Sequence, residues 1–402
     1  MEIAVLGYGT VGSGVVEVLE VNQKSIAQKA GENIHVKYVL DLRDFFGQPI
    51  QDRIVHDYET ILNDPEIKIV VEVLGGVEPA YTYVRQALET GKSVATSNKE
   101  LVAKHGADLL ALAKENNVNF MFEASVGGGI PIIRPLISSL TADEITEITG
   151  ILNGTTNYML TKMDEEGADY DAVLKDAQEK GYAERHPEAD VEGYDACRKI
   201  AILTSLVCGR QVDFEDIYTE GITKITDTDF KYARTLGTSI KLLATSKNVN
   251  GNIYAMVSPV MIGKKHPLYS VRDVFNAVFV NGNMLGDAMF YGKGAGKLPT
   301  ASAVVADVVE ETKHAGENIG IQWQPQKQDI ADYKEMSHRF FVRISDTVSK
   351  AHVKEVFGDG DFETLEVVPG EYAFVTEMMP EKTFDEKLKN ITDVLTVIRG
   401  NF

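Results

Sequence analysis

The sequence predicts an α/β protein that begins with a doubly wound parallel sheet and continues with regions of mixed strands and helices. Three observations lead to this prediction. A glycine-rich loop joins an apolar strand pattern to a helical pattern at the N-terminus, strands and helices then alternate to about residue 130, and their order changes twice further on. At 402 residues the chain exceeds the usual size of one domain. We expect domains at 1–130, 131–297 and 338–402, with 298–320 returning to the first.

Composition and charge exclude several classes of protein. The formal net charge is −20 and no lysine- or arginine-rich run offsets it, which argues against a nucleic-acid partner. No apolar run approaches the roughly 18 residues that a membrane-spanning helix needs. The N-terminus lacks the pattern of a signal peptide, so we expect a cytoplasmic protein. Cys197 and Cys208 lie on an apolar helical pattern and are expected to be buried core thiols.

The N-terminal motif predicts a dinucleotide site. Residues 3–6 form an apolar strand pattern, and residues 7–12 have the pattern Gly-x-Gly-x-x-Gly before valines at helical spacing. Such glycines allow a tight turn and close approach of a pyrophosphate, with the helix N-terminus facing the anion. This is the Rossmann arrangement; a glycine-rich turn without a ligand is the alternative interpretation. The expected cofactor-binding residues are Gly7, Gly9, Thr10, Val11 and Gly12.

The end of the second strand bears on the choice between NAD and NADP. This strand is expected at 36–40 and is followed by Asp41 and Arg43. An acid at this place binds the ribose 2′-hydroxyl of NAD, whereas a nearby arginine accommodates the 2′-phosphate of NADP. Because both residues are present, the sequence leaves the cofactor open. Further strands are expected at 67–73, 93–96 and 119–122, with helices at 81–90 and 106–116.

Ligands of doubly wound sheets lie at the carboxyl ends of the strands, and two such ends are informative. After the strand at 93–96, Ser97 and Lys99 stand where a nicotinamide or its substrate would lie; the alternative is a solvated loop lysine. After the strand at 119–122, residues 123–131 contain three consecutive glycines before a proline. Such an irregular loop exposes carbonyl groups that suit a hard cation, and the alternative is a hinge between domains.

The stretch 181–199 carries the strongest indication of chemistry. A run of acidic residues is followed by Asp195 and Lys199, which are four apart and share one face of a helix. The apolar residues that follow predict that this helix is buried. A lysine there, with carboxylates in the preceding loop, can hold an ammonium group and transfer a proton. The alternative is a solvated acidic loop with a surface ion pair. Other elements of this α+β region are expected at 132–140 and 157–164 as helices, at 144–152 as a strand, and at 219–224, 240–244, 252–260 and 278–280 with mixed character.

A second glycine-rich loop, within 291–297, precedes Pro299 at the expected start of an alanine- and valine-rich helix. Such a helix N-terminus would bring Gly296 back to the cofactor. The alternative is a tight linker helix.

Five motifs give the chain a resemblance to homoserine dehydrogenase. They occur in the family's order within residues 1 to about 310: SNKE, EASVGGGIP, GILNGTTNY, GYAE…ADVEGYDACRK and GKGAGKLPTASAVVADV. The resemblance implies NAD- or NADP-dependent interconversion of L-homoserine and L-aspartate 4-semialdehyde, in the synthesis of threonine, methionine and isoleucine. We also expect a homodimer or homotetramer, with no nucleic-acid or membrane partner.

The resemblance implies roles for individual residues. Lys199 would donate or accept the proton at the substrate hydroxyl, with Lys99 beside the reacting centre. The residues implied in substrate binding are Glu184, Asp190, Thr155 and Asp195. A sodium ion would be bound by main-chain oxygens of Glu123, Val126, Gly128 and Ile130. One departure is His186, preceded by Arg185, where the family usually has an acid; because Glu184 and Asp190 remain, we expect activity to survive.

Two other functions stay open. A phosphorylating semialdehyde dehydrogenase needs a reactive cysteine in a polar, accessible setting, which neither Cys197 nor Cys208 provides. A non-catalytic sensor could pair a nucleotide-binding fold with an effector domain, but it would have no need of both Lys99 and Lys199 beside an acidic loop.

The C-terminal region, from about His338, predicts the order βαββαβ, with a helix to Phe357 and later elements at 362–367, 372–378, 384–391 and 394–399. This order is ferredoxin-like and resembles an ACT domain, a type that binds amino-acid effectors in this family. The glycine expected in the first strand-to-helix turn is replaced by β-branched Thr347 and Val348. We therefore expect weak or absent inhibition by threonine and a role in joining subunits.

Overall fold

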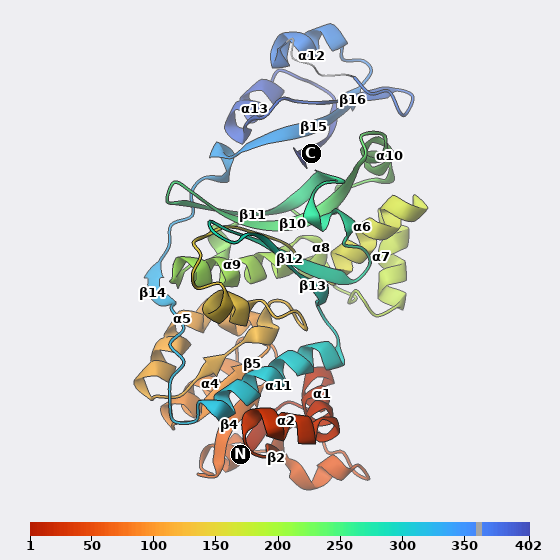
Figure 1. Ribbon diagram of the computed structural model, residues 1–402. Helices are drawn as coiled ribbons and strands as arrows, with labels where there is room; N and C mark the ends of the chain where they lie inside the picture. Colours follow the sequence, from red (N-terminus) through yellow and green to blue (C-terminus); the bar gives the residue numbers. More distant parts are fainter. Residues whose placement is uncertain (359–363) are drawn as a thin grey trace. The chain divides into compact units, whose positions relative to one another are not determined.

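The computed structural model describes residues 1–358 and 364–402. The chain divides into two compact units (Figure 1). Unit 1 comprises Met1–Glu144, Ala201–Phe214 and Phe290–Gln328, and unit 2 comprises Ile145–Ile200, Glu215–Met289 and Asp329–Phe402. None of the helices within the described ranges combines the length and the apolar character needed to cross a bilayer.

Unit 1 is built on a six-stranded sheet in which neighbouring strands run parallel. The strand order β3-β2-β1-β4-β5-β6 is that of a dinucleotide-binding sheet whose direction of winding reverses between β1 and β4. The predicted Rossmann-type fold class is therefore confirmed. The elements of this unit are β1 (Glu2–Leu6), α1 (Thr10–Val21), α2 (Gln23–Ala30), β2 (His35–Leu40), β3 (Ile54–Val55), α3 (Tyr58–Leu62), β4 (Ile67–Glu72), α4 (Ala80–Glu89), β5 (Ser93–Thr96), α5 (Lys99–Glu115), β6 (Phe120–Met121), α11 (Lys297–Lys313), and the paired short strands β8 (Arg210–Gln211) and β14 (Gln324–Lys327).

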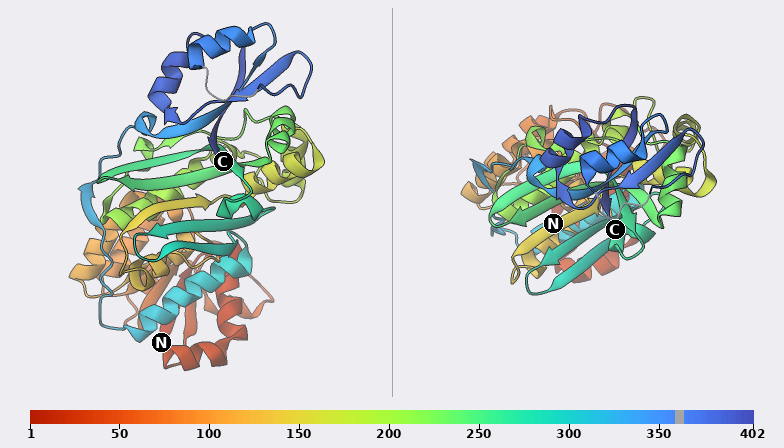
Figure 2. Two further views of the ribbon diagram at one scale, coloured as in Figure 1. Left: turned by 45° about the horizontal axis from the view of Figure 1, so that its top comes forward. Right: turned by 90° about the horizontal axis from the view of Figure 1, so that it is seen from above.

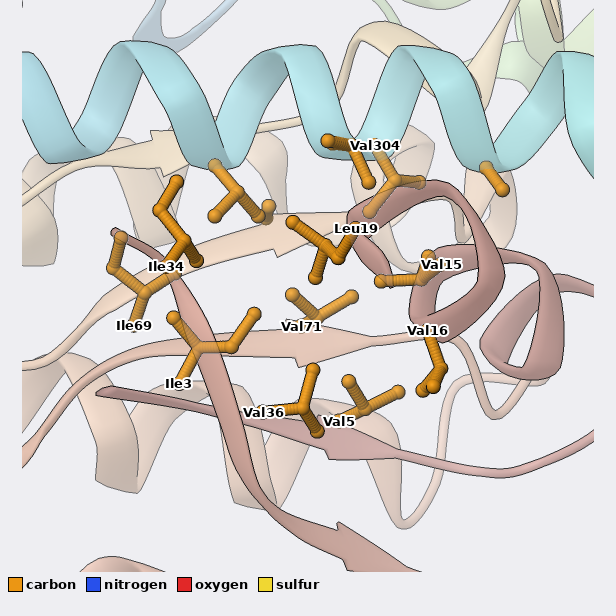
Figure 3. Packing of buried hydrophobic residues seen from close by; sticks show 14 of the residues in the cluster. Ile3, Val5, Val15, Val16, Leu19, Ile34, Val36, Ile69, Val71 and Val304 are labelled. Carbon is orange, nitrogen blue, oxygen red and sulfur yellow. The ribbon is translucent and has the colours of Figure 1, made fainter. Parts of the chain in front are cut away.

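The core of unit 1 lies between this sheet and the helices α1, α2 and α11 (Figure 3). Side chains alternate along a strand, so every second residue of β1 and β4 faces these helices. The labelled members of the cluster are Ile3, Val5, Val15, Val16, Leu19, Ile34, Val36, Ile69, Val71 and Val304. The intervening Ala4 and Val70 are fully buried as well, so both faces of the sheet are covered, as parallel sheets require.

Two predicted helices in unit 1 differ from the structure. Helix α5 begins at Lys99, not at Gly106, because the Asn98 side chain accepts the Leu101 N–H at 3.1 Å and caps the helix. Gly106 lies inside the helix, where the ring of Trp323 packs against it. The helix predicted at 132–140 contains one π-helical turn over Pro135–Ser139.

Unit 2 contains most of a mixed sheet in the order β13-β12-β7-β10-β11-β18-β15-β16 (Figure 2). Strands β10 and β11 form a long antiparallel hairpin whose turn is Asn250-Gly251. Both residues have positive φ, 53° and 87°, as the two-residue turns of twisted hairpins require. The elements are β7 (Ile145–Ile151), α6 (Gly154–Glu166), α7 (Tyr170–Glu179), α8 (Glu188–Val191), α9 (Tyr194–Cys208, continuing into unit 1), β9 (Tyr218–Thr219), α10 (Asp227–Thr235), β10 (Thr238–Val249), β11 (Asn252–Gly263), β12 (Phe275–Gly282), β13 (Gly286–Lys293), β15 (Ser337–Ser345), α12 (Lys350–Phe357), β16 (Glu371–Val375), β17 (Met379–Pro380), α13 (Glu381–Leu388) and β18 (Val394–Asn401).

Several elements were not predicted, and helix α7 and strand β13 are two of them. Helix α7 buries only Val173 and Ala177, so its apolar stripe is too short to stand out in the sequence. Strand β13 alternates between exposed and half-buried residues at the sheet edge, and its last residues belong to the predicted glycine-rich loop.

The C-terminal elements form a three-stranded antiparallel part of this sheet, in the order β18-β15-β16, with α12 and α13 packed against it (Figures 1 and 2). Strand β18 also pairs in parallel with β11, Val260 opposite Arg399, so the sheet continues without a break. Of the strand predicted at 362–367, residues 362 and 363 lie outside the described ranges. The remainder makes a single bridge, between Leu365 and Ala373, and is not a strand.

Candidate active site

Lys199 and Asp195 form a buried ion pair on α9. Lys199 Nζ lies 2.7 Å from Asp195 Oδ2 and donates to the Leu152 carbonyl oxygen at 2.8 Å. The two residues are one helical turn apart, so the helix itself places them side by side. Lys199 is only 8% exposed and Asp195 2%, so the pair is not the solvated surface pair of the alternative interpretation. An ammonium group held in this way is positioned to exchange a proton with a neighbouring oxygen.

Asn153 joins this pair to the acidic stretch. Its Nδ2 donates to Asp195 Oδ2 at 2.9 Å and to Asp190 Oδ1 at 2.7 Å. Its Oδ1 accepts the Thr156 N–H at 2.8 Å and so caps α6. This cap fixes the Asn153 side chain. The two Asn153 Nδ2 hydrogen bonds then join Asp190 to the pair of Asp195 and Lys199, so that all of them form one hydrogen-bonded group. Asn153 was not among the predicted site residues, although an asparagine between a strand end and a helix start is a usable signal in the sequence.

Thr155 and Glu184 are the other residues expected to bind the substrate, and they lie on two segments that a hydrogen bond joins. Thr155 is buried at the start of α6, and its Oγ1 donates to the Tyr182 carbonyl at 2.7 Å. Glu184 is exposed, and its carbonyl oxygen accepts a hydrogen bond from Gln178 Nε2 at 3.0 Å. The Thr155 bond therefore holds the chain two residues before Glu184. His186 is exposed in the same loop.

The glycine-rich loop after β1 has the shape that a pyrophosphate site requires. Gly7 has a φ of +99°, and a Cβ on Gly12 would lie 1.9 Å from the Gly7 carbonyl oxygen. A Cβ on Gly9 would meet no atom within 4 Å, so the loop is open at that point. Helix α1 starts at Thr10 with Gly9 as its N-cap and has no side-chain cap. The first N–H groups of the helix, from Thr10 and Val11, are therefore available to an anion.

Helix α11 adds a second N-terminus beside α1. Its N-cap is Gly296, and again no side chain caps the helix. Lys297, in the first turn, places its Nζ 2.7 Å from Glu17 Oε2 of α1, and the two helices pack closely along each other (Figure 1). The uncapped N-terminal turn of α11 thus packs on α1, the helix that follows the glycine loop, and this arrangement fits a dinucleotide pyrophosphate.

Asp41 and Arg43 form a bidentate pair at the end of β2. Arg43 Nε and Nη2 each lie 2.9 Å from an Asp41 carboxylate oxygen, and the backbone N–H groups of Arg43 and Tyr8 donate to the same carboxylate at 3.0 and 2.9 Å. The Arg43 guanidinium holds the pKa of the Asp41 carboxyl far below its usual range. The two residues with opposite expected effects on NADP are therefore hydrogen-bonded to each other.

A buried polar network supports the strand end that carries Lys99. Glu72, at the end of β4, accepts a hydrogen bond from Thr96 Oγ1 at 2.6 Å, and burial raises the pKa of the Glu72 carboxyl. The Ser97 N–H donates to the Glu72 carbonyl at 3.4 Å, and Asn98 caps α5. Lys99 is consequently the half-buried first residue of a helix and is not a loop residue.

The triple-glycine loop is fixed at both ends. The Glu123 carboxylate accepts the N–H groups of residues 132–134 at 2.6–2.9 Å. A Cβ on Gly128, whose φ is +57°, would lie 2.2 Å from the Gly294 carbonyl oxygen, so the two glycine-rich loops pack backbone against backbone. No cluster of three or more His, Cys, Asp or Glu residues able to hold a metal occurs in 1–358 and 364–402. A cation in this loop would depend on main-chain oxygens.

Cys197 and Cys208 are not joined in a disulfide. Cys197 is buried as predicted, whereas Cys208 is partly exposed, because it lies near the end of α9. Burial raises the pKa of both thiols, that of Cys208 to about 11. Protonated thiols are poor nucleophiles, so neither residue suits covalent catalysis on an aldehyde.

Comparisons with known proteins agree on one family. A family model described as "Homoserine dehydrogenase" matches residues 131–309, and one described as "Homoserine dehydrogenase, NAD binding domain" matches residues 7–123. The homoserine dehydrogenase of Bacillus subtilis is 38% identical over 416 aligned residues, covering 99% of this chain and 96% of that one. The crystal structure of a homoserine dehydrogenase from Thiobacillus denitrificans has a TM-score of 0.91 at 35% identity, covering 100% and 98% of the two chains. A hyperthermophilic archaeal homoserine dehydrogenase mutant in complex with NADPH has a TM-score of 0.66 at 29% identity, covering 78% and 98%.

Proposed function

The chain belongs to the homoserine dehydrogenase family and is an NAD-binding oxidoreductase that acts on a CH–OH group, and we propose that Lys199 carries the proton of its reaction. That reaction is the interconversion of L-homoserine and L-aspartate 4-semialdehyde. The observation that supports Lys199 is its buried pair with Asp195, which Asn153 joins to Asp190.

The proposed chemistry divides between the cofactor and the protein. When bound, the nicotinamide supplies hydride transfer to or from the carbon that bears the hydroxyl group. Oxidising this primary alcohol also removes the hydroxyl proton, and reducing the aldehyde returns it. As the neutral amine, Lys199 Nζ accepts the proton from the substrate oxygen in the first direction and becomes the ammonium; as the ammonium, it donates that proton in the second direction. Asp195, 2.7 Å away, and the Leu152 carbonyl orient the nitrogen and stabilise its charged form.

The acidic stretch is proposed to bind the substrate's amino group. Homoserine carries an ammonium group, and a carboxylate is the natural partner for such a charge. Asp190 is held next to the Lys199 pair, and Glu184 offers a second carboxylate on the same loop. Thr155 lines the site and anchors this loop through the Tyr182 carbonyl.

The cofactor is proposed to be NAD or NADP, bound at the carboxyl edge of the parallel sheet. Its pyrophosphate would be held by the residue 7–12 loop and by the N-termini of α1 and α11. Asp41 and Arg43 would contact the adenosine ribose, and Ser97 and Lys99 the nicotinamide end. The NADPH complex of the archaeal relative supports a site that accepts the 2′-phosphate.

Two finer features complete the proposal. A sodium ion bound by main-chain oxygens of residues 123–130 would fix this loop; activity that is equal in sodium and choline salts at one ionic strength would argue against it.

A homodimer or homotetramer is supported by the exposed edge strand β13, which presents the large apolar side chains of Met289 and Tyr291. Light scattering measures that assembly directly.

The decisive experiment follows reduced nicotinamide spectroscopically with homoserine and either NAD or NADP. Asp190→Asn and Glu184→Gln should raise the KM for homoserine about tenfold or more, because each removes a charged partner of the ammonium group. The KM of the nucleotide should change little. Glu188→Gln, which alters another exposed acid of the same stretch, is the matched control. A change confined to the nucleotide KM would contradict the assignment, and absence of turnover in the unaltered protein would favour a non-catalytic sensor.

A further inference from the structure

A buried ion cluster connects the C-terminal strand β18 to the residues that follow β9. Arg399 of β18 donates to the Glu381 carboxylate from Nη2 at 2.6 Å and from Nε at 2.8 Å, and from Nη1 to Glu220 Oε2 at 2.8 Å. Its guanidinium carbon lies 5.2 Å from the centroid of the Tyr218 ring. Because only 8% of the Arg399 side chain is exposed, the Glu220 carboxylate is held by a desolvated, fixed charge.

Glu220 is anchored on β11, and the two residues that follow it pack directly on α8. The Glu220 N–H donates to the Val257 carbonyl and the Ile222 N–H donates to the Val191 carbonyl, each at 2.8 Å. Between them, a Cβ on Gly221 would lie 2.1 Å from the Val191 carbonyl oxygen, so the two backbones are in close contact. A displacement of Glu220 therefore has to be accommodated by α8.

Helix α8 carries Asp190, whose carboxylate is bonded to Asn153 at 2.7 Å. We propose that Arg399 and Glu220 are positioning residues for Asp190, and that they act through the contact of residues 221 and 222 with α8. This inference rests on the substrate-binding role of Asp190 in the proposed function. It gives the C-terminal strand a part in binding homoserine that requires no effector.

A second buried arginine of the C-terminal sheet provides a matched comparison. Arg343 of β15 lies 3.4 Å from a carboxylate oxygen of Asp229 and 3.4 Å from one of Glu371, and its side chain is also 8% exposed. Asp229 lies in the first turn of α10, where it forms a capping box with Thr226. These contacts lead from the C-terminal sheet to α10 rather than to α8.

The test compares Glu220→Gln with Glu371→Gln. Each change removes one negative charge that faces a buried arginine and keeps the shape of the side chain. Glu220→Gln should raise the KM for homoserine about three- to tenfold with little change in the nucleotide KM, whereas Glu371→Gln should leave both values near those of the unaltered protein. Thermal unfolding of the two variants checks that both remain folded. A loss of stability alone would not raise the KM for homoserine while leaving the KM for the nucleotide unchanged. If Glu220→Gln does not fold, Glu220→Asp provides the comparison, because its shorter side chain keeps the charge and alters the reach to Arg399.

A double-mutant cycle shows whether Glu220 acts through Asp190. In the Asp190→Asn background, Glu220→Gln should raise the homoserine KM by less than about twofold, because the residue that it positions is already altered. An equal rise in both backgrounds, or equal effects of Glu220→Gln and Glu371→Gln, would overturn the inference. If Asp190→Asn itself left the homoserine KM unchanged, the proposed function would lose its substrate acid. That result can be distinguished from failure of the inference about Glu220, because it is measured in a variant in which Glu220 is unaltered.

Discussion

Replacing Asp41 by alanine is expected to shift cofactor use toward NADP. In the structure the Asp41 carboxylate accepts four hydrogen bonds, three of them from Arg43. A 2′-phosphate bound at the end of β2 would meet this negative charge, and Arg43 would not be free to turn to it. The substitution removes the repulsion between Asp41 and the 2′-phosphate, and it also releases the Arg43 guanidinium group.

Coulomb's law gives the size of the effect. Two unit charges about 4 Å apart interact by about 1 kcal/mol in bulk water and about 4 kcal/mol at an effective dielectric constant of about 20. Arg43 is largely exposed, so solvent screening favours the lower part of this range, about 1–2 kcal/mol. The ratio of kcat/KM for NADP to that for NAD should therefore rise about 5- to 30-fold in Asp41→Ala.

The assay measures initial rates with each nucleotide at saturating homoserine. Arg43→Ala is the opposing variant, since it leaves Asp41 unpaired and should move the ratio toward NAD. A ratio that is the same in the unaltered protein and in both variants would mean that Asp41 and Arg43 lie away from the 2′ position and would contradict this prediction.

Two further predictions concern the C-terminal region. Calorimetric titration of threonine into the intact protein should show no saturable binding in the micromolar range, because Thr347 and Val348 occupy the turn where a glycine would be needed; saturable binding that disappears when residues 338–402 are removed would refute this. Burial, with the nearby charges of Arg399 and Lys247, lowers the pKa of His338 to about 4. Between about pH 4 and 6.5 the unfolded chain therefore binds more protons at this residue than the folded chain does. The free energy of unfolding should consequently rise with pH across that window. Chemical unfolding of His338→Gln should show a flatter dependence, and an unchanged slope would mean that other groups dominate.

Local pattern was enough to place most elements of the parallel sheet. The strand at 93–96 was predicted to the residue, because a short buried run is bounded by polar residues on both sides. Its neighbour α5 was predicted to begin too late, because Gly106 was taken as a boundary although the ring of Trp323 packs on it. Such a contact joins segments far apart in the sequence and leaves no local signal.

In the candidate site, too, some features were predictable from local sequence and others depend on segments far apart in the chain. The relation of Asp195 to Lys199 follows from helix geometry alone and was predicted, as was the open glycine loop after β1. The role of Asn153 depends on two carboxylates that arrive from separate helices, and the packing of Gly128 on Gly294 depends on two distant loops. These arrangements exist only in the folded chain.

The central claim is that Lys199 transfers the substrate proton, and the turnover of a Lys199 variant tests it most directly. Lys199→Ala would leave Asp195 buried beside a cavity, so Lys199→Met with Asp195→Asn, which keeps the volume and removes both charges, is measured beside it. With homoserine and nucleotide saturating, kcat should fall by a factor of about 10² to 10⁴ in both proteins, while thermal unfolding shows that they are folded. Folded variants that turn over homoserine at nearly the original rate would remove Lys199 from the mechanism.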